Sequence, residues 1–215
     1  MILYSIYFFL ISVALLLSII VVRQGNKRFI SILFLLVATL SVEILAGVGY
    51  WLHREFVWAY HLYSPIEYLF IATFVLTSTH NRTTKNLIAF SVLLYMLFSI
   101  SLSVFVYHFL GMPGINIGVE SLLIFSLCTY RLFNLEATDK PIFLVADFWI
   151  CIGFLLFFGG CSFFFAVYTP LFKTSVISAL SLFGTIAMPL NLLLYSLIII
   201  GLLCLIPKRN SASQL

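Results

Sequence analysis

The amino-acid sequence predicts an all-α membrane protein, a bundle of seven transmembrane helices with the N-terminus outside and the C-terminus in the cytoplasm. Three observations lead to this prediction: the composition, the spacing of long apolar runs and the distribution of basic residues. Of the 215 residues, 63% are hydrophobic and only 8% are charged, whereas a soluble domain carries roughly a quarter charged residues. Because such a chain cannot cover itself with a polar surface, we expect one transmembrane domain over residues 1–215.

Seven apolar runs divide the chain. A helix needs about 20 apolar residues to cross roughly 30 Å of hydrocarbon, and backbone groups in lipid must be hydrogen-bonded within their own segment. The first run has no basic residue before it and no small-residue cleavage site, so we expect a span and not a cleaved signal peptide. The predicted spans are approximately residues 2–22, 29–51, 65–79, 86–110, 116–135, 142–168 and 176–206.

The basic residues predict the orientation. With the N-terminus outside, only Arg54 and Lys173 of the eleven Lys and Arg residues lie on the outer side. That asymmetry is typical of proteins that obey the positive-inside rule, and an even number of spans would place the basic C-terminal segment outside. The net charge of +4 is therefore a topology signal, and we expect the lipid bilayer and no nucleic acid as a partner.

The segment from Tyr50 to Glu67 holds two of the four histidines and two of the three tryptophans. We expect it to form an interfacial loop, because Trp and Tyr favour the headgroup level. It ends in Ser64-Pro65-Ile66-Glu67, which matches a capping box with Ser64 as N-cap, Pro65 at N1 and Glu67 at N3. The motif favours a capping role for Glu67 over a role in binding.

Ionisable side chains inside spans are costly and often mark a site. Thr39, Glu43, Gly47 and Tyr50 share one face of the second span, so Glu43 should face the bundle interior. Pro189 should kink the seventh span, where polar residues share one face. We therefore expect an outward-facing ligand pocket. Its predicted residues are Glu43, Tyr50, His61, Glu67, Glu120, Asn191 and Tyr195, with His108 as a further candidate.

A second polar layer is predicted near the inner side. Arg131 and Asp147 lie at comparable depth on consecutive antiparallel spans, and pairing removes two uncompensated charges from a low-dielectric layer. The alternative is that Arg131 extends to the cytoplasmic headgroups.

A metal site would need ligands such as His53, His61 and His108, which fall near one membrane face with three glutamates. No His-x3-His or Glu-x2-His spacing places two ligands on one helix, which is the pattern that would indicate zinc. The sequence also has no glycine-rich phosphate loop, no nucleophile elbow and no Cys-x-x-Cys pair, and its seventh span has no lysine for a retinal Schiff base. We expect no metal, no cofactor and no catalytic residues.

Three segments carry a resemblance: Phe148-Trp149-Ile-Cys-Ile-Gly153 followed by Gly160, then Asn191-Leu-Leu-Leu-Tyr195, and Tyr63-Ser-Pro-Ile-Glu67. Over about the last two-thirds of the chain, they resemble a loose group of small, uncharacterised seven-span bacterial membrane proteins. The resemblance implies a bacterial cytoplasmic membrane and no particular activity. The topology is also similar to the membrane regions of seven-span bacterial sensors, although no kinase or cyclase domain follows.

The polar outer layer, the predicted kink and the missing catalytic motifs favour a non-enzymatic sensor or ligand-binding module that signals through a protein partner. Two alternatives stay open. One is a small-solute or proton-coupled transporter, in which the outer acids take up protons and Arg131 with Asp147 gates the inner side. The other is a metal-dependent intramembrane hydrolase.

Overall fold

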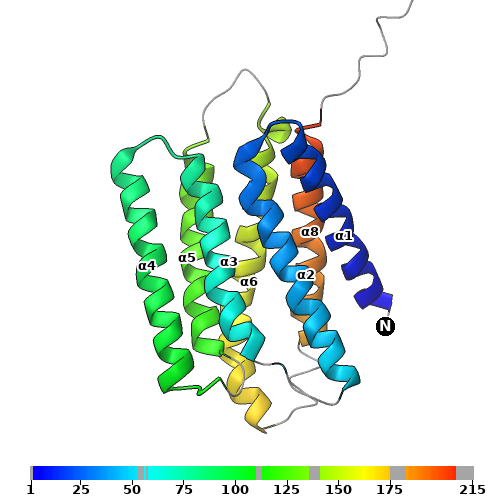
Figure 1. Ribbon diagram of the computed structural model, residues 1–215, viewed down its shortest axis with the longest axis vertical. Coiled ribbons are helices and arrows are strands. Elements are labelled where there is room, and N and C mark those ends of the chain that lie inside the picture. The colour runs from blue at the N-terminus through cyan, green and yellow to red at the C-terminus, as the bar shows by residue number, and fades with distance from the viewer. Residues whose placement is uncertain are drawn as a thin grey trace, which may run out of the picture.

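A computed structural model describes residues 2–52, 56, 58–109, 113–135, 141–174 and 183–206, with the side chains of Ile2, Tyr50, 163–174 and 183–184 left aside. All regular structure in these ranges is helical (Figure 1). Two short 3-10 helices, η1 (Lys27–Phe29) and η2 (Ile142–Leu144), precede α2 and α6, and a π-helical turn, η3 (Phe183–Ala187), precedes α8. The α-helices are α1 (Ile2–Arg23), α2 (Ile30–Trp51), α3 (Trp58–Thr77), α4 (Arg82–Phe105), α5 (Gly114–Phe133), α6 (Ala146–Thr174) and α8 (Met188–Leu203).

The apolar helices identify a membrane protein. By length and composition, five described segments could cross a bilayer: Leu3–Arg23, Lys27–Gly49, Arg82–Phe105, Gly114–Phe133 and Thr185–Leu203. Ala146–Ser162 is a shorter apolar helix. Large apolar side chains such as Phe90, Leu94 and Phe105 are exposed on α4. Apolar surface of this kind is stable in hydrocarbon and costly in water.

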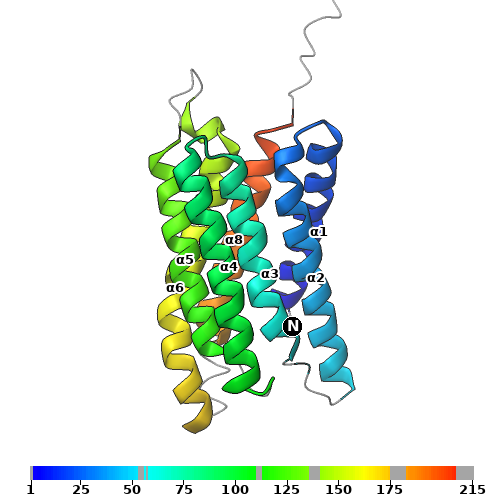
Figure 2. The same cartoon turned by 60° about the vertical axis from the view of Figure 1, so that its left-hand side comes forward.

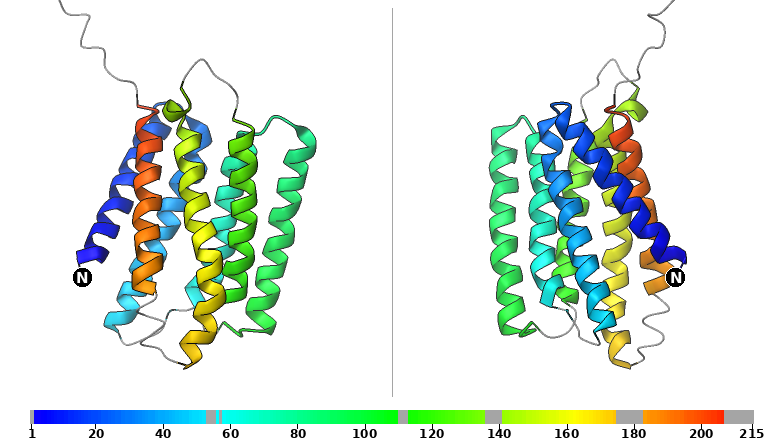
Figure 3. Two further views of the ribbon diagram at one scale, coloured as in Figure 1. Left: turned by 180° about the vertical axis from the view of Figure 1, so that it is seen from behind. Right: turned by 45° about the vertical axis from the view of Figure 1, so that its right-hand side comes forward.

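Successive helices run in opposite directions, so the start of α1 and the end of α8 lie at opposite ends of the bundle (Figures 1 and 2). Six helices contact one another in a closed ring, in the order α1, α2, α3, α5, α6, α8 and back to α1. The fourth helix, α4, packs outside this ring against α3 and α5 (Figure 3). Alternation and short connections thus place residues from distant parts of the chain around one interior.

Glycines allow α6 and α8 to approach closely. A Cβ added at Gly160 would lie 2.6 Å from Leu190 Cδ1, and one added at Gly201 would lie 3.0 Å from the backbone oxygen of Ala146. At Gly153 the nearest atoms belong to Leu194 and Leu197. Gly153 and Gly160 thus leave the room that α8 needs to pack closely against α6.

The predicted loop over residues 50–67 and the predicted capping box are wrong. Helix α3 begins at Trp58, so Ser64 and Pro65 lie inside it. Pro65 removes one backbone hydrogen bond without ending the helix, which membrane helices tolerate because neighbouring groups satisfy the freed backbone. The side chain of Ser64 consequently contacts other helices instead of capping its own.

Two other boundaries differ from expectation. Helix α6 continues to Thr174, past Thr169-Pro170, where the sixth span was expected to end. Pro189 occupies the first turn of α8, directly after the π-helical turn. Proline fits that position because its missing N–H is not needed there. In place of the expected kink within one continuous helix, the chain changes from a π-helical turn to an α-helix at Met188. The beginning of the predicted seventh span, residues 176–182, lies outside the described ranges.

Candidate ligand-binding pocket

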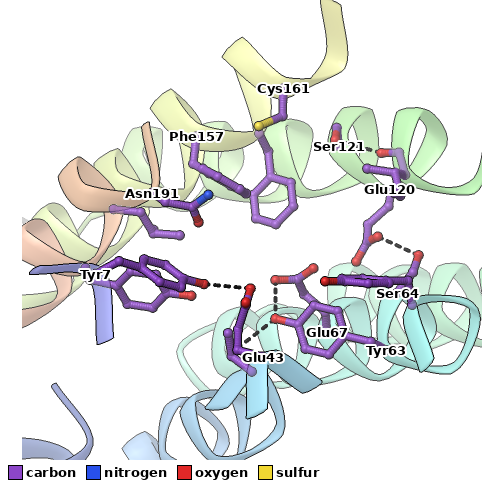
Figure 4. Close-up of a pocket in the computed structure, with 16 residues that line it drawn as sticks. Tyr7, Glu43, Tyr63, Ser64, Glu67, Glu120, Ser121, Phe157, Cys161 and Asn191 are labelled. Atoms are coloured by element: carbon purple, nitrogen blue, oxygen red, sulfur yellow. Dashed lines mark hydrogen bonds between the residues drawn. The ribbon is translucent and has the colours of Figure 1, made fainter. Parts of the chain in front are cut away.

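The interior of the six-helix ring contains a cavity of about 150 Å³, and each of the six helices contributes to its lining (Figure 4). We call it the acidic pocket, because three of its residues are glutamates. The polar lining consists of Tyr7, Thr39, Glu43, Tyr60, Tyr63, Ser64, Glu67, Glu120, Ser121, Cys161, Asn191 and Tyr195. The apolar lining consists of Ile117, Phe157, Phe158 and Leu194.

Two of the glutamates are hydrogen-bonded to tyrosines (Figure 4). The hydroxyl of Tyr7 on α1 donates to Glu43 Oε1 on α2 at 2.9 Å. The hydroxyl of Tyr63 lies 2.8 Å from Glu67 Oε1, one turn along α3. Tyr63 also lies 2.7 Å from Thr39 Oγ1 on α2. These contacts hold the two carboxyl groups at the interface of α1, α2 and α3.

The third glutamate, Glu120 on α5, is the most deeply buried, with 1% of its surface exposed. Ser64 Oγ lies 2.6 Å from Glu120 Oε2, at hydrogen-bond distance. The other carboxyl oxygen, Oε1, has no hydrogen-bond partner among the described residues. Buried polar atoms are nearly always hydrogen-bonded, so an unpartnered oxygen at a cavity wall indicates a ligand or solvent partner.

A polar network continues from Ser64 toward α4 and the start of α5. Ser64 Oγ lies 2.6 Å from the hydroxyl of Tyr95, which donates to the backbone oxygen of Asn116 at 3.1 Å. Asn116 Nδ2 donates to Ser103 Oγ at 3.3 Å. Although α4 lies outside the ring, it is thereby connected to the wall of the acidic pocket.

The pocket combines acidic and aromatic groups. Among its lining residues, all of them in the described ranges, none is Lys, Arg or His. The rings of Tyr7 and Tyr195 meet edge to face with centroids 5.5 Å apart, and those of Phe157 and Phe158 do so at 4.9 Å. Carboxylates and aromatic faces both attract cations, so the chemistry of the wall suits a positively charged guest.

The structure brings together five of the seven residues predicted to bind a ligand: Glu43, Glu67, Glu120, Asn191 and Tyr195 all line the acidic pocket. His61 does not. It lies on a different face of α3, buried, with Nδ1 3.0 Å from Ser103 Oγ and its ring against Tyr107 and Phe109. The side chain of Tyr50 lies outside the described part of the structure.

The metal candidates do not converge. His108 is exposed beyond the end of α4 with a φ of 50°, His61 is buried between α3 and α4, and His53 is outside the described residues. Within the described ranges, no group of three or more His, Cys, Asp or Glu side chains could hold a metal ion.

Sequence analysis missed several residues of the pocket, above all Tyr7, Tyr63 and Ser64. The apolar run around Tyr7 predicts only a span, and the local motif predicts that Tyr63 and Ser64 belong to the interfacial loop and its cap. A usable signal was present in α3, where Tyr60, Tyr63, Ser64 and Glu67 recur at helical spacing. That periodicity extends the helix back through the proline.

Asp147 lies at the other end of the ring, with 0% of its side chain exposed. Arg131 donates to Asp147 Oδ2 through Nε at 3.0 Å and through Nη2 at 2.5 Å. Arg28, just before α2, donates to Oδ1 at 2.5 Å. We call these three residues the Asp147 cluster. The predicted pair of Arg131 and Asp147 is present, whereas the contact of Arg28 was not predicted.

The helices and the pocket together define the class of the molecule, an all-helical membrane protein with an acidic, aromatic interior site. Comparison with protein-family models, curated proteins and solved structures finds no match for this chain.

Proposed function

We propose that this chain is a seven-span protein of the bacterial cytoplasmic membrane, with its N-terminus outside and its C-terminus in the cytoplasm. Six of the seven basic residues in the described ranges support the orientation, because they lie at one end of the bundle: Arg23, Lys27, Arg28, Arg82, Lys85 and Arg131. The seventh, Lys173, lies near the end of α6, at the other end of the bundle. The positive-inside rule assigns that end to the cytoplasm. The two spans beyond the five apolar candidates would be α3 and α6, which contribute polar residues such as Tyr63, Glu67 and Cys161 to the acidic pocket.

In this orientation the acidic pocket belongs to the outer half of the membrane. Tyr7 is five residues from the start of α1 and Glu120 is six from the start of α5, about 8–9 Å along each helix at 1.5 Å per residue. Arg131 lies eleven residues further along α5, about 16 Å deeper.

The function that the pocket supports best is a non-enzymatic sensor or ligand-binding module that passes its state to a protein partner. The observation that carries this proposal is the unpartnered Glu120 Oε1 in the wall of a cavity formed by six helices. A ligand that contacts all six helices can bind one arrangement of them more tightly than another. Such a difference in affinity is the physical requirement for signalling by population shift.

Thermal unfolding in lipid nanodiscs tests the proposal. A panel of small probes, namely benzene, tetrahydropyran and piperidinium, would be added to the parent, to Glu43→Gln with Glu120→Gln, and to Arg82→Gln as a control distant from the pocket. A ligand that binds only the folded state raises its stability. At least one probe should stabilise the parent and Arg82→Gln more than the double variant. Equal responses of all three proteins would refute the pocket.

A small-solute or proton-coupled transporter is the second candidate. It is favoured by the arrangement of an acidic pocket at one level of the ring and the Asp147 cluster at another, because a transporter needs a site and a separate closure. Uptake of labelled piperidine into proteoliposomes after an imposed pH step, in excess of its passive uptake into protein-free liposomes, would support transport. A sensor gives no such excess.

A further inference from the structure

The acidic pocket has the size and the lining for one small organic molecule. An engineered protein cavity of about 150 Å³ lined by apolar residues binds benzene, and the acidic pocket has the same volume of about 150 Å³. Its guest would therefore have roughly six heavy atoms. The three glutamates and the absence of described basic residues in the wall exclude an anion, since a buried charge needs a charge of opposite sign beside it.

Hydrogen positions can be assigned by counting protons along the contacts of Glu120. Its Oε2, Ser64 Oγ, the Tyr95 hydroxyl and the backbone oxygen of Asn116 form a chain of three contacts at 2.6, 2.6 and 3.1 Å. A hydroxyl donates only one proton and a carbonyl donates none. Ser64 and Tyr95 therefore supply two protons for three contacts, and the third must come from Glu120.

Glu67 begins a second chain with the same count. Its Oε1, the Tyr63 hydroxyl, Thr39 Oγ1 and the backbone oxygen of Leu35 make three contacts at 2.8, 2.7 and 2.9 Å. Tyr63 and Thr39 again supply two protons, so the third contact requires a proton on Glu67. Glu43 differs, because its single contact with Tyr7 is complete when the glutamate is ionised.

We propose that the acidic pocket binds a small monovalent organic cation, such as an amine of about six heavy atoms, in exchange for the proton of Glu120. The proposal rests on the ligand-binding function proposed above. On binding, the proton of Glu120 leaves to solvent and the carboxylate pairs with the cation, so that the charge of the pocket is unchanged. Oε1, unpartnered in the empty pocket, becomes the acceptor for the cation.

The exchange alters the hydrogen bonds of α4. Once Glu120 is ionised, Ser64 donates to it, Tyr95 donates to Ser64, and no proton remains for the contact with Asn116. Binding of the cation therefore removes the hydrogen bond between Tyr95 on α4 and the backbone oxygen of Asn116 in the first turn of α5. This contact lies at the edge of the ring, where a partner protein could detect the change.

The groups that face Glu120 are acids, phenols and a thiol. They are Glu43 and Glu67, the tyrosines Tyr7, Tyr60, Tyr63, Tyr68, Tyr95 and Tyr195, and Cys161. His61 joins this network through Ser103 and Asn116. When Glu120 loses its proton, no described cation in the pocket wall compensates the negative charge. The guest itself must provide the positive charge.

Isothermal titration calorimetry of the nanodisc-embedded protein tests the exchange. Piperidinium and tetrahydropyran have the same ring size and differ in charge. The cation should bind at least about tenfold more tightly, because ion pairing and contact with aromatic faces add to the shared burial. If one proton is released, its affinity should rise about tenfold per pH unit, and the heat should differ between buffers of different ionisation enthalpy. Tetrahydropyran should show neither effect.

Two variants assign the proton. Glu120→Gln cannot ionise, so it should lose both the preference for piperidinium and the proton release, whereas Arg82→Gln should retain them. Tyr95→Phe serves if Glu120→Gln fails to fold. Without the Tyr95 hydroxyl, Ser64 can donate to an ionised Glu120, so the variant should bind piperidinium with a weaker pH dependence than the parent.

The outcomes separate this inference from the proposed function. If both probes bind equally and the pocket variants weaken both alike, the guest need not be a cation, and that part of the inference is wrong. The proposed ligand-binding function would then stand. Preference for piperidinium without proton release, or an unchanged pH dependence in Tyr95→Phe, would overturn the exchange. If neither probe binds, and no probe of the thermal-unfolding panel stabilises the parent more than the double variant, the ligand-binding function itself is refuted.

Discussion

Replacing Asp147 with alanine should destabilise the protein strongly. The substitution removes the shared acceptor of two arginines, of which Arg131 has only 12% of its side chain exposed and donates twice. Breaking a buried ion pair by removing one partner costs about 3–5 kcal/mol, because the other charge stays buried and unpaired. Arg28 is 38% exposed, and a pair of that exposure contributes at most about 1 kcal/mol.

These magnitudes order a set of variants. Asp147→Ala and Arg131→Gln should each cost about 3 kcal/mol, and Arg28→Gln about 1 kcal/mol or less. For a chain of this length 1 kcal/mol corresponds to about 2–4 °C in Tm, so the first two should melt roughly 6–12 °C below the parent and Arg28→Gln within about 4 °C.

Thermal unfolding in nanodiscs, followed by circular dichroism, measures this order. Arg82→Gln, an exposed arginine at the same end of the bundle, is the control and should change stability by less than about 0.5 kcal/mol. If Arg28→Gln lowers Tm as much as Arg131→Gln, the assignment of Arg131 as the principal partner is wrong. If Asp147→Ala melts with the control, the Asp147 cluster does not stabilise the fold.

Three further predictions follow from the packing, the topology and the hydrogen bonds. Gly201→Ala should cost about 1–3 kcal/mol through overpacking, because the added Cβ would lie 2.8 Å from Ile150 Cγ1. Gly47→Ala, with open space around the glycine, should be neutral or stabilise the protein by up to about 1 kcal/mol. Thermal unfolding of the two variants measures the difference. In a cysteine-free background, a membrane-impermeant maleimide applied to intact cells should label His108→Cys but not Asn26→Cys, and the reverse would invert the proposed topology. Tyr7→Phe should cost about 1–2 kcal/mol by removing the hydrogen bond to Glu43, and a Tm equal to that of the parent would show that the bond contributes nothing.

Composition and apolar runs sufficed to predict a helical membrane protein, because the cost of exposing backbone groups to lipid leaves few other architectures. The runs also located the cores of the helices to within a few residues at most ends. They failed at Ser64 and Pro65, where a local capping pattern outweighed the helical periodicity on both sides of it. The capping-box prediction was wrong, because membrane helices accept an internal proline that a soluble helix would not.

The glutamates of the pocket could be predicted because an ionisable group inside a span needs a polar environment wherever it lies. Their partners could not. Tyr7 and Glu43 are 36 residues apart, and Arg28 and Asp147 are 119 apart, so only the ring order of the helices brings each pair together. A single sequence contains no information on that order. His61 illustrates the converse, because its polarity placed it in the pocket while its helical phase turns it toward α4.

The Asp147 cluster has a consequence for biosynthesis. Arg28 and Arg131 both precede Asp147 in the chain, so both arginines enter the membrane region before their counter-ion has been translated. Until α6 is inserted, their long side chains must extend to the headgroups at that end of the bundle. Arrival of one aspartate at the start of α6 then joins the connector before α2 to the end of α5. Assembly of the ring is therefore completed late, and a ribosome stalled before residue 147 would carry five helices with two unneutralised charges.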